Sequence, residues 1–223
     1  GVQTCALPIW VNSPSNPTGR VHSEAEYRAA IEWSRKTGGV VVSDECYLEF
    51  GTNVTPTSIL NFTDGDNKNI LAVHSLSKRS NLAGYRGAFV IGDPALISQI
   101  LEVRKHAGMM VPLPIQKAMV AALSDSAHVS VQRERYNARK KTLAPALQAA
   151  GFKINFSDAG LYLWATRNED CWASVAWLAE LGILATPGIF YGEKGSQHIR
   201  IAMTATDAQI SEAAARILAK MEK

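Results

Sequence analysis

The stretch ILAVHSLSKRSNLAGYRGAFVIGD, residues 70–93, contains two apolar runs separated by a polar, basic segment. The first run ends at Ser75 and the second begins at Gly87, and neither alternates apolar with polar residues. Apolar runs of this length without alternation are typical of strands that are buried on both faces of a sheet. The stretch therefore predicts two central strands, with the basic segment where the first of them ends.

The segments before this stretch continue the pattern. The run GVVVSDE, residues 39–45, predicts another buried strand. Ser23 followed by Glu26 is a capping-box pattern, which predicts a helix that runs to about Lys36 and stops before Gly38. Strands and helices that alternate in this way favour an α/β fold, with a mixed, mostly parallel sheet covered by helices on both faces.

The second half of the chain has a different character. Residues 125–150 read as one long helix, despite Pro145, and we expect this helix to connect the sheet to a smaller α+β unit. The elements predicted in the smaller unit are strands at Phe152–Asn155, Gly160–Ala165, Ile183–Ala185 and His198–Met203, and helices at about Asp170–Leu181 and Asp207–Met221.

Composition excludes several classes of protein. The chain has 223 residues, of which 47% are hydrophobic and 19% charged, enough for one large domain or two small ones. A formal charge of +3 without long basic runs argues against a nucleic-acid or membrane-surface partner. Three distant cysteines, Cys5, Cys46 and Cys171, argue against a disulfide scaffold or zinc site and favour the cytoplasm. No apolar run reaches the roughly 18 residues of a membrane span.

A phosphate and a reactive amine are both suggested by the basic segment. Ser75, Ser77 and Arg86 offer the hydroxyls and the guanidinium that bind a phosphate. Lys78 lies among them with few acidic neighbours, and an amine near other cations has a lowered pKa and attacks carbonyls. A cofactor that is both an aldehyde and a phosphate meets both needs. Asp44 also follows a predicted strand, at the edge where such sheets place their sites.

Each of these residues also has a more common explanation when it is taken alone. An aspartate after a strand usually forms a turn or caps a helix, and an isolated lysine is usually solvated. NPTG alone is a turn, and Arg200 in an alternating strand can be half-exposed without any function. Only the joint pattern favours a functional site.

Five segments together resemble the class I and II aminotransferases, the fold-type I enzymes that use pyridoxal 5′-phosphate (PLP). They are NSPSNPTG from Asn12, SDECY from Ser43, SLSK from Ser75, GYRG from Gly84 and IRIAM from Ile199. The resemblance implies that Lys78 binds the cofactor aldehyde and moves protons, and that Asp44 pairs with the pyridine nitrogen. The other implied ligands are Tyr47 and Asn16 for the phenolic oxygen, Ser75, Ser77 and Arg86 for the phosphate, and Arg200, beside Asn16, for the substrate carboxylate.

Within that family, segments such as NSPSNPTGRV, VRKHAGMMVP and TPGIFYG are similar to actinobacterial succinyldiaminopimelate aminotransferases of lysine biosynthesis. This likeness implies amino transfer between glutamate and an oxo acid derived from N-succinyl-LL-diaminopimelate. Members of the family act on small amino and oxo acids, and a homodimer is implied for the intact enzyme. Metal ligands are not implied.

The family also has a long segment before NPTG, which this chain does not show. We therefore expect a fragment with weak activity of its own, in which residues 1–9 are a leader unrelated to the family, 10–124 a partial cofactor-binding domain, 125–150 the connecting helix and 151–223 the small domain. Two alternatives remain open: a catalytically silent, ligand-sensing domain of a bacterial regulator, and another PLP enzyme such as a C–S lyase or a decarboxylase.

Overall fold

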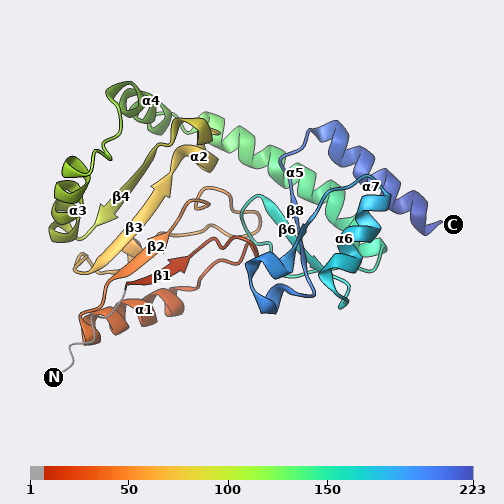
Figure 1. Ribbon diagram of the computed structural model, residues 1–223, viewed down its shortest axis with the longest axis horizontal. Coiled ribbons are helices and arrows are strands. Elements are labelled where there is room, and N and C mark those ends of the chain that lie inside the picture. The colour runs from red at the N-terminus through yellow and green to blue at the C-terminus, as the bar shows by residue number, and fades with distance from the viewer. Residues whose placement is uncertain (1–7, 223) are drawn as a thin grey trace. The chain divides into compact units, whose positions relative to one another are not determined.

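The computed structural model describes residues 8–222, and these residues form two compact units whose longer helices and strands are labelled in Figure 1. The described part of unit 1 consists of residues 8–14, 21–49 and 55–129, and that of unit 2 of residues 15–20, 50–54 and 130–222. Residues 1–7 of the predicted leader lie outside the described residues. The predicted domain boundaries at residues 124 and 150 stay a prediction.

Unit 1 is built on a four-stranded sheet of order β1-β2-β3-β4 (Figure 1). The strands are β1 (Ile9–Asn12), β2 (Val41–Asp44), β3 (Ile70–Ser75) and β4 (Ala88–Gly92). β1, β2 and β3 are parallel, and β4 is antiparallel to β3. The three strands predicted from their apolar runs and the mixed, mostly parallel sheet are thus confirmed, and β1 is an additional strand.

Helix α1 (Glu24–Thr37) covers part of this sheet. Its capping box is complete, since the Ser23 side chain accepts from the Glu26 amide and the Glu26 carboxylate accepts from the Ser23 amide. The helix ends at Gly38, whose φ of 72° is in the left-handed region that glycine adopts without strain. Tyr27 and Ile31 of this helix pack in a core cluster with β2 and β3. The prediction for this helix is confirmed.

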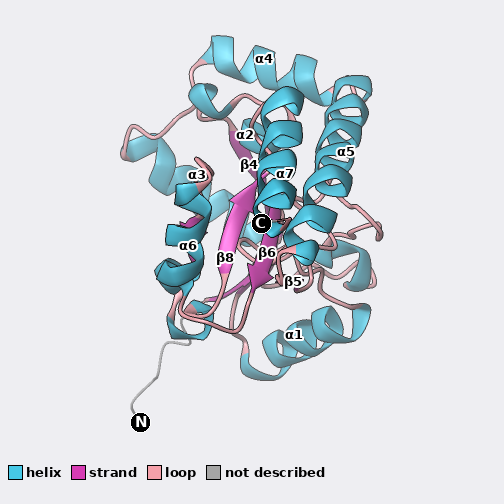
Figure 2. Ribbon diagram, turned by 90° about the vertical axis from the view of Figure 1, so that its right-hand side faces the viewer, coloured by secondary structure: helices cyan, strands magenta, loops and turns pink. Residues whose placement is uncertain are grey.

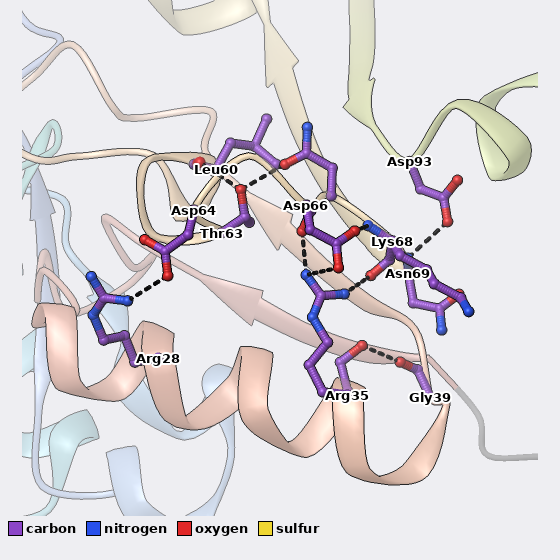
Figure 3. Close-up of polar contacts among 12 residues, drawn as sticks. Arg28, Arg35, Gly39, Leu60, Thr63, Asp64, Asp66, Lys68, Asn69 and Asp93 are labelled. Atoms are coloured by element: carbon purple, nitrogen blue, oxygen red, sulfur yellow. Dashed lines mark hydrogen bonds and ion pairs between the residues drawn. The ribbon is translucent and has the colours of Figure 1, made fainter.

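The loop that leads into β3 is tied to α1 and to the end of β4, as Figure 3 shows. Arg28 Nη1 lies 3.3 Å from Asp64 Oδ2, and Arg35 Nη2 lies 3.3 Å from Asp66 Oδ2. The Asn69 amide donates to Asp93 Oδ2 over 2.7 Å, and this bond is the main cause of the lowered pKa of Asp93. Exposed ion pairs contribute little energy. Their effect here is to orient the loop from which β3 begins.

The remaining elements of unit 1 connect these strands. They are the short helices η1 (Ile59–Phe62), α2 (Leu76–Arg79) and η2 (Ala83–Tyr85), and the longer helices α3 (Pro94–His106) and α4 (Leu113–Leu123). β2 and β3 are parallel neighbours with Asp44 paired to Val73, so their carboxyl ends lie at the same edge of the sheet. The segments after Asp44 and Ser75 therefore begin close together.

Unit 2 contains an antiparallel sheet of order β5-β6-β8-β7, in which β6 and β8 lie side by side (Figure 2). Its strands are β5 (Lys153–Ile154), β6 (Tyr162–Thr166), β7 (Thr186–Pro187) and β8 (Ile199–Ala202). Its helices are α5 (Ala127–Ala149, which starts in unit 1), α6 (Cys171–Glu180), η3 (Gly188–Tyr191), η4 (Glu193–Gly195) and α7 (Asp207–Met221). The predicted helices and three of the predicted strands of this half are confirmed.

The strand predicted at Ile183–Ala185 is wrong, because β7 begins at Thr186. The Ile183 amide donates to the carbonyl of Leu178 over 2.9 Å, so it closes the end of α6 instead of joining a strand. Leu184 is 92% exposed and points away from the core. Ile183–Ala185 has the apolar composition of a strand, but it belongs to the connection between the end of α6 at Glu180 and the start of β7 at Thr186.

Each unit has its own buried apolar residues. In unit 1 the largest fully buried side chains include Ile59, Ile70 and Leu76, and in unit 2 they include Leu143, Leu147, Leu178, Ile199, Met203 and Ile217. Across residues 8–222, no helix combines the length and the apolar character that crossing a membrane requires.

Candidate active site

Asp44 is fixed where β2 ends. Its backbone carbonyl accepts from Asn12 Nδ2 and from the Ser13 amide, each over 3.1 Å. Its carboxylate Oδ1 accepts from the Cys46 amide, also over 3.1 Å. The half-buried carboxylate is therefore held by the first turn after the strand.

Lys78 is placed by the one-turn helix that follows β3. Ser75 caps this helix, since its Oγ accepts from the Ser77 amide over 3.1 Å. Leu76 is fully buried and its amide donates to the Gly87 carbonyl over 3.2 Å, which anchors the turn to the start of β4. Lys78 lies within the single turn of helix that Ser75 caps. The amine is half-buried at the strand end.

The thiol of Cys46 is affected by both Asp44 and Lys78. The pKa of Cys46 is raised to about 12, first by burial and then by a hydrogen bond with Asp44 and the charge of that carboxylate, while the charge of Lys78 acts in the opposite direction. Charges act on a thiol in this way only at short range. The Asp44 carboxylate and the Lys78 amine therefore both lie within electrostatic reach of the Cys46 thiol in unit 1.

A buried carboxylate, Glu45, lies next to Asp44 in the chain and close to the half-buried His74. The Glu45 side chain is fully buried; its Oε1 accepts from the Ile59 amide over 2.9 Å and its Oε2 lies 3.3 Å from His74 Nε2. The His74 ring stacks on Phe89 with a centroid distance of 5.1 Å. Glu45 follows Asp44 in the chain and His74 precedes Ser75. The pair thus links the two backbone segments that carry the candidate residues, and the sequence analysis did not find it.

Tyr47 and Arg86 complete the predicted residues in unit 1. Tyr47 is 7% exposed, in the turn after Asp44. Arg86 has a left-handed φ of 53° and is exposed, and its Nη1 donates to the Ala83 carbonyl over 2.8 Å. Between described residues, no hydrogen bond joins this guanidinium to Ser75 or Ser77. A guanidinium has five N–H donors, so this contact leaves donors available for a phosphate.

Arg200 and Asn16 form a second group, within unit 2. Arg200 Nη1 donates to Asn16 Oδ1 over 2.8 Å. Asn16 belongs to a turn that closes when the Ser15 amide donates to Arg20 O over 2.9 Å and the Gly19 amide to Ser15 O over 2.7 Å. The remaining N–H groups of the guanidinium can bind a carboxylate in the bidentate geometry that arginine favours.

Two tyrosines beside Arg200 were missed by the sequence analysis. The Arg200 Cζ atom lies 4.1 Å from the ring centroid of Tyr162 and 5.1 Å from that of Tyr191. Tyr162 pairs with Ala202 and Trp164 pairs with Arg200, so Tyr162 is the diagonal neighbour of Arg200 on one sheet face. The register of two strands about 40 residues apart was the missing information.

The fold and these residues define a class of protein. A mixed sheet with an aspartate and a lysine at neighbouring strand ends, together with a smaller α+β unit that carries an arginine, is the fold of the aminotransferases. The chain matches the family "Aminotransferase class I and II" over residues 6–217. The chain belongs to the class I and II aminotransferase family.

Individual relatives agree with this assignment. The chain is 57% identical over 219 residues to the "Probable aminotransferase Rv1178" of Mycobacterium tuberculosis, covering 97% of this chain and 52% of that protein. It is 57% identical over 211 residues to the "4-dedimethylamino-4-oxo-anhydrotetracycline transaminase OxyQ" of Streptomyces rimosus, covering 94% and 59%. The chain thus spans about half the length of the relatives it matches.

Solved structures share the fold. An aminotransferase from Neisseria meningitidis superposes with a TM-score of 0.87 at 31% identity, covering 96% of this chain and 57% of that chain. A "probable N-succinyldiaminopimelate aminotransferase" from Thermus thermophilus superposes with a TM-score of 0.83 at 26% identity, covering 95% and 58%. The expected fold, a PLP-transferase fold of type I, is therefore confirmed.

Proposed function

We propose that this protein is a PLP-dependent aminotransferase that moves an amino group between glutamate or 2-oxoglutarate and a second amino or oxo acid. The observation that supports this most directly is the parallel pairing of β2 and β3, which brings the segments that carry Asp44 and Lys78 to one edge of the sheet. A carboxylate and an amine in one place are the two groups that the chemistry of PLP needs from a protein.

The residues present fit this cofactor. Ser75 caps α2 and Ser77 lies one residue before Lys78 in the chain, so both hydroxyls belong to the segment that carries the amine, and Arg86 has N–H donors left for a phosphate. Asp44 would accept a hydrogen bond from a protonated pyridine nitrogen, a role that requires a carboxylate. Tyr47 follows in the same turn, as a donor for a phenolic oxygen.

When bound, PLP supplies an aldehyde that carries the amino group and a ring that accepts electrons from the substrate α-carbon. Lys78 would hold the aldehyde, and its amine, once released, would remove and return the proton at the substrate α-carbon. Asp44 would keep the ring nitrogen protonated. Arg200 and Asn16 would orient the substrate through its α-carboxylate.

For the second substrate we propose the oxo form of N-succinyl-LL-diaminopimelate, an intermediate of lysine biosynthesis. The segments that resemble succinyldiaminopimelate aminotransferases support this choice. The protein from Thermus thermophilus that shares the fold is also named a probable N-succinyldiaminopimelate aminotransferase. The name of the Streptomyces relative favours a second candidate, a polycyclic ketone. The two acceptors differ in charge and in size, so a direct comparison of rates separates them.

The setting we propose follows the family. We infer that the intact enzyme is a homodimer that works in the cytoplasm on small molecules, without a nucleic-acid or membrane partner. Cys46 and Cys171 are free thiols, which suits a reducing compartment.

Covalent capture of PLP tests the proposal without relying on turnover. The chain is incubated with PLP, reduced with borohydride and digested, and the phosphopyridoxyl group is located by mass spectrometry. We expect modification at Lys78, absent in Lys78→Ala and unchanged in Lys117→Ala. Random labelling of exposed lysines, with Lys78 unmodified, would contradict the proposed site.

Amino transfer from glutamate is then measured with both acceptors. Transfer distinguishes an aminotransferase from a silent ligand-sensing domain, and release of sulfide from cysteine conjugates would identify a C–S lyase instead.

A further inference from the structure

The Arg200 guanidinium lies over two aromatic rings of unit 2. Its Cζ atom is 4.1 Å from the centroid of Tyr162 and 5.1 Å from that of Tyr191, both within the roughly 6 Å over which a cation and a ring face attract each other. Tyr162 is 8% exposed and comes from β6, and Tyr191 is 38% exposed and ends η3. Two different elements thus contact one side chain of β8.

Both rings are themselves held in place. Tyr162 is fixed on β6 by the register that pairs it with Ala202. The ring of Tyr191 meets Trp164 edge-on, with a centroid distance of 6.0 Å and an interplanar angle of 79°. Trp164 is 5% exposed and its ring stacks on His198 at 4.9 Å. The two tyrosine rings therefore form a rigid support for the guanidinium.

Few hydrogen bonds fix the guanidinium. Nη1 donates to Asn16 Oδ1 over 2.8 Å, whereas the buried Nε–H has no hydrogen-bond partner among residues 8–222. One hydrogen bond still allows a guanidinium to swing about that bond. Contact with two ring faces restricts this freedom, because a guanidinium that turns away loses its attraction to both rings.

We infer that Tyr162 and Tyr191 are positioning residues that hold Arg200 in the orientation in which its free N–H groups receive the carboxylate of an amino or oxo acid. The inference rests on the proposed function, which assigns Arg200 to the substrate carboxylate. Aromatic partners suit this role better than acidic ones. A carboxylate beside Arg200 would orient it but would also neutralise its charge and compete with the substrate, whereas a ring leaves both the charge and the N–H donors available.

The test uses the signal of the arginine itself. In the full chain labelled with ¹⁵N-arginine, the Arg200 Nε–H resonance is assigned from its absence in Arg200→Lys, and 2-oxoglutarate is titrated as the probe. We expect saturable shifts of this resonance. Tyr191→Phe keeps the ring and should bind the probe within about twofold of wild type. Tyr191→Leu should bind about 3- to 30-fold more weakly, the range that corresponds to one cation–π contact.

Two further variants separate positioning from general damage. Tyr162→Phe and Tyr162→Leu repeat the comparison on the more buried ring. Trp177→Leu removes a ring that lies 4.7 Å from Cζ of a different arginine, Arg167, and should leave binding of the probe unchanged. Thermal melting of every variant identifies any that is unfolded, and only folded variants are compared.

The outcomes test the positioning role of the two tyrosines separately from the proposed function. Wild-type binding that depends on Arg200, with equal affinity in Tyr191→Leu and in a folded Tyr162→Leu, would overturn the inference and leave the proposed function intact. A wild-type chain in which 2-oxoglutarate does not shift the Arg200 signal would overturn the assignment of Arg200, and the inference with it.

Discussion

Arg200 and Asn16 are 184 residues apart in the chain, yet Arg200 Nη1 lies 2.8 Å from Asn16 Oδ1. The contact joins β8 to the turn that contains NPTG, and both belong to unit 2. A neutral amide is an informative partner, because it orients the guanidinium without cancelling its charge. The identity of residue 16 should therefore control how strongly Arg200 attracts an anion.

Asn16→Asp tests this control. The new carboxylate would pair with Arg200 and occupy the charge that a substrate carboxylate needs, so we expect 2-oxoglutarate to bind at least about tenfold more weakly. Isothermal titration calorimetry measures the affinity. Asn168→Asp, which makes the same charge change at an exposed site of unit 2, is the control and should bind as the wild type does. Equal affinities in both variants would contradict the role of Asn16.

The Cys46 thiol should respond in opposite directions to its two charged neighbours. Burial and Asp44 raise its pKa to about 12, so at pH 9 only about one molecule in a thousand carries the reactive thiolate. Asp44→Asn should speed alkylation, and Lys78→Met should slow it, each by roughly three- to tenfold, the effect of half to one pKa unit. Iodoacetamide labelling at pH 9, followed at the Cys46 peptide by mass spectrometry, measures both rates.

Lys117→Met is the control for this experiment, because Lys117 is an exposed residue of α4. The result is independent of any cofactor. Changes of the same sign in Asp44→Asn and Lys78→Met would show that the two groups do not share the region around Cys46.

Lys140 should make the stability of unit 2 depend on pH. Its side chain is 4% exposed, and its Nζ lies 2.9 Å from Thr52 Oγ1 and 3.5 Å from the Ser157 carbonyl. Burial lowers the pKa of Lys140 from 10.5 to about 8, and the charge of Asp158 acts in the opposite direction. Between pH 8 and 10.5 the unfolded chain therefore holds a proton that the folded chain has lost, so the free energy of unfolding rises with pH in this range.

The size of this effect is about 3 kcal/mol, from 1.36 kcal/mol per pKa unit. We expect wild type to gain this stability relative to Lys140→Met as the pH rises from 8 to 10.5, and the difference between the two proteins to be constant below pH 8. Urea unfolding across the pH series measures the difference. Lys141→Met changes the exposed neighbour of Lys140 and should follow the wild type at every pH. A constant difference between wild type and Lys140→Met would rule out the lowered pKa.

Local signals explain which elements were predictable from the sequence. Helix α1 was predicted because local signals mark both of its ends. The Ser23–Glu26 capping box marks the start, and Gly38 marks the end. β3 was predicted because it begins with the unbroken apolar run Ile70–Val73. The structure buries the first three residues of this run. Neither prediction required knowledge of contacts distant in the chain.

Elements that depend on distant contacts were not predictable in this way. The triplet that begins at Ile183 has the composition of a strand, but its first amide is taken by the end of α6. The contact of Tyr162 with Arg200 depends on the register of β6 and β8, which the sequence alone does not give. The contact of Tyr191 depends on the position of η3. The prediction that Asp44 and Lys78 serve one site came from the resemblance to a family, because no local rule relates two residues that are 34 positions apart.

Gly188 should be required for the fold around Tyr191. A Cβ atom at this position would lie 2.5 Å from the His198 carbonyl oxygen and closer still to that of Gly195, and backbone oxygens cannot rotate away as a flexible side chain can. The Gly188 amide also donates to the same His198 oxygen over 2.7 Å. Gly188→Ala should lower the free energy of unfolding by about 1 to 3 kcal/mol, as overpacking of a tight site does.

Because Gly188 begins η3 and Tyr191 ends it, the Arg200 Nε–H resonance should also shift in Gly188→Ala. Gly84→Ala is the control, since a Cβ there meets nothing within 4 Å. Chemical denaturation compares the two variants, and equal midpoints would show that η3 can move aside without cost.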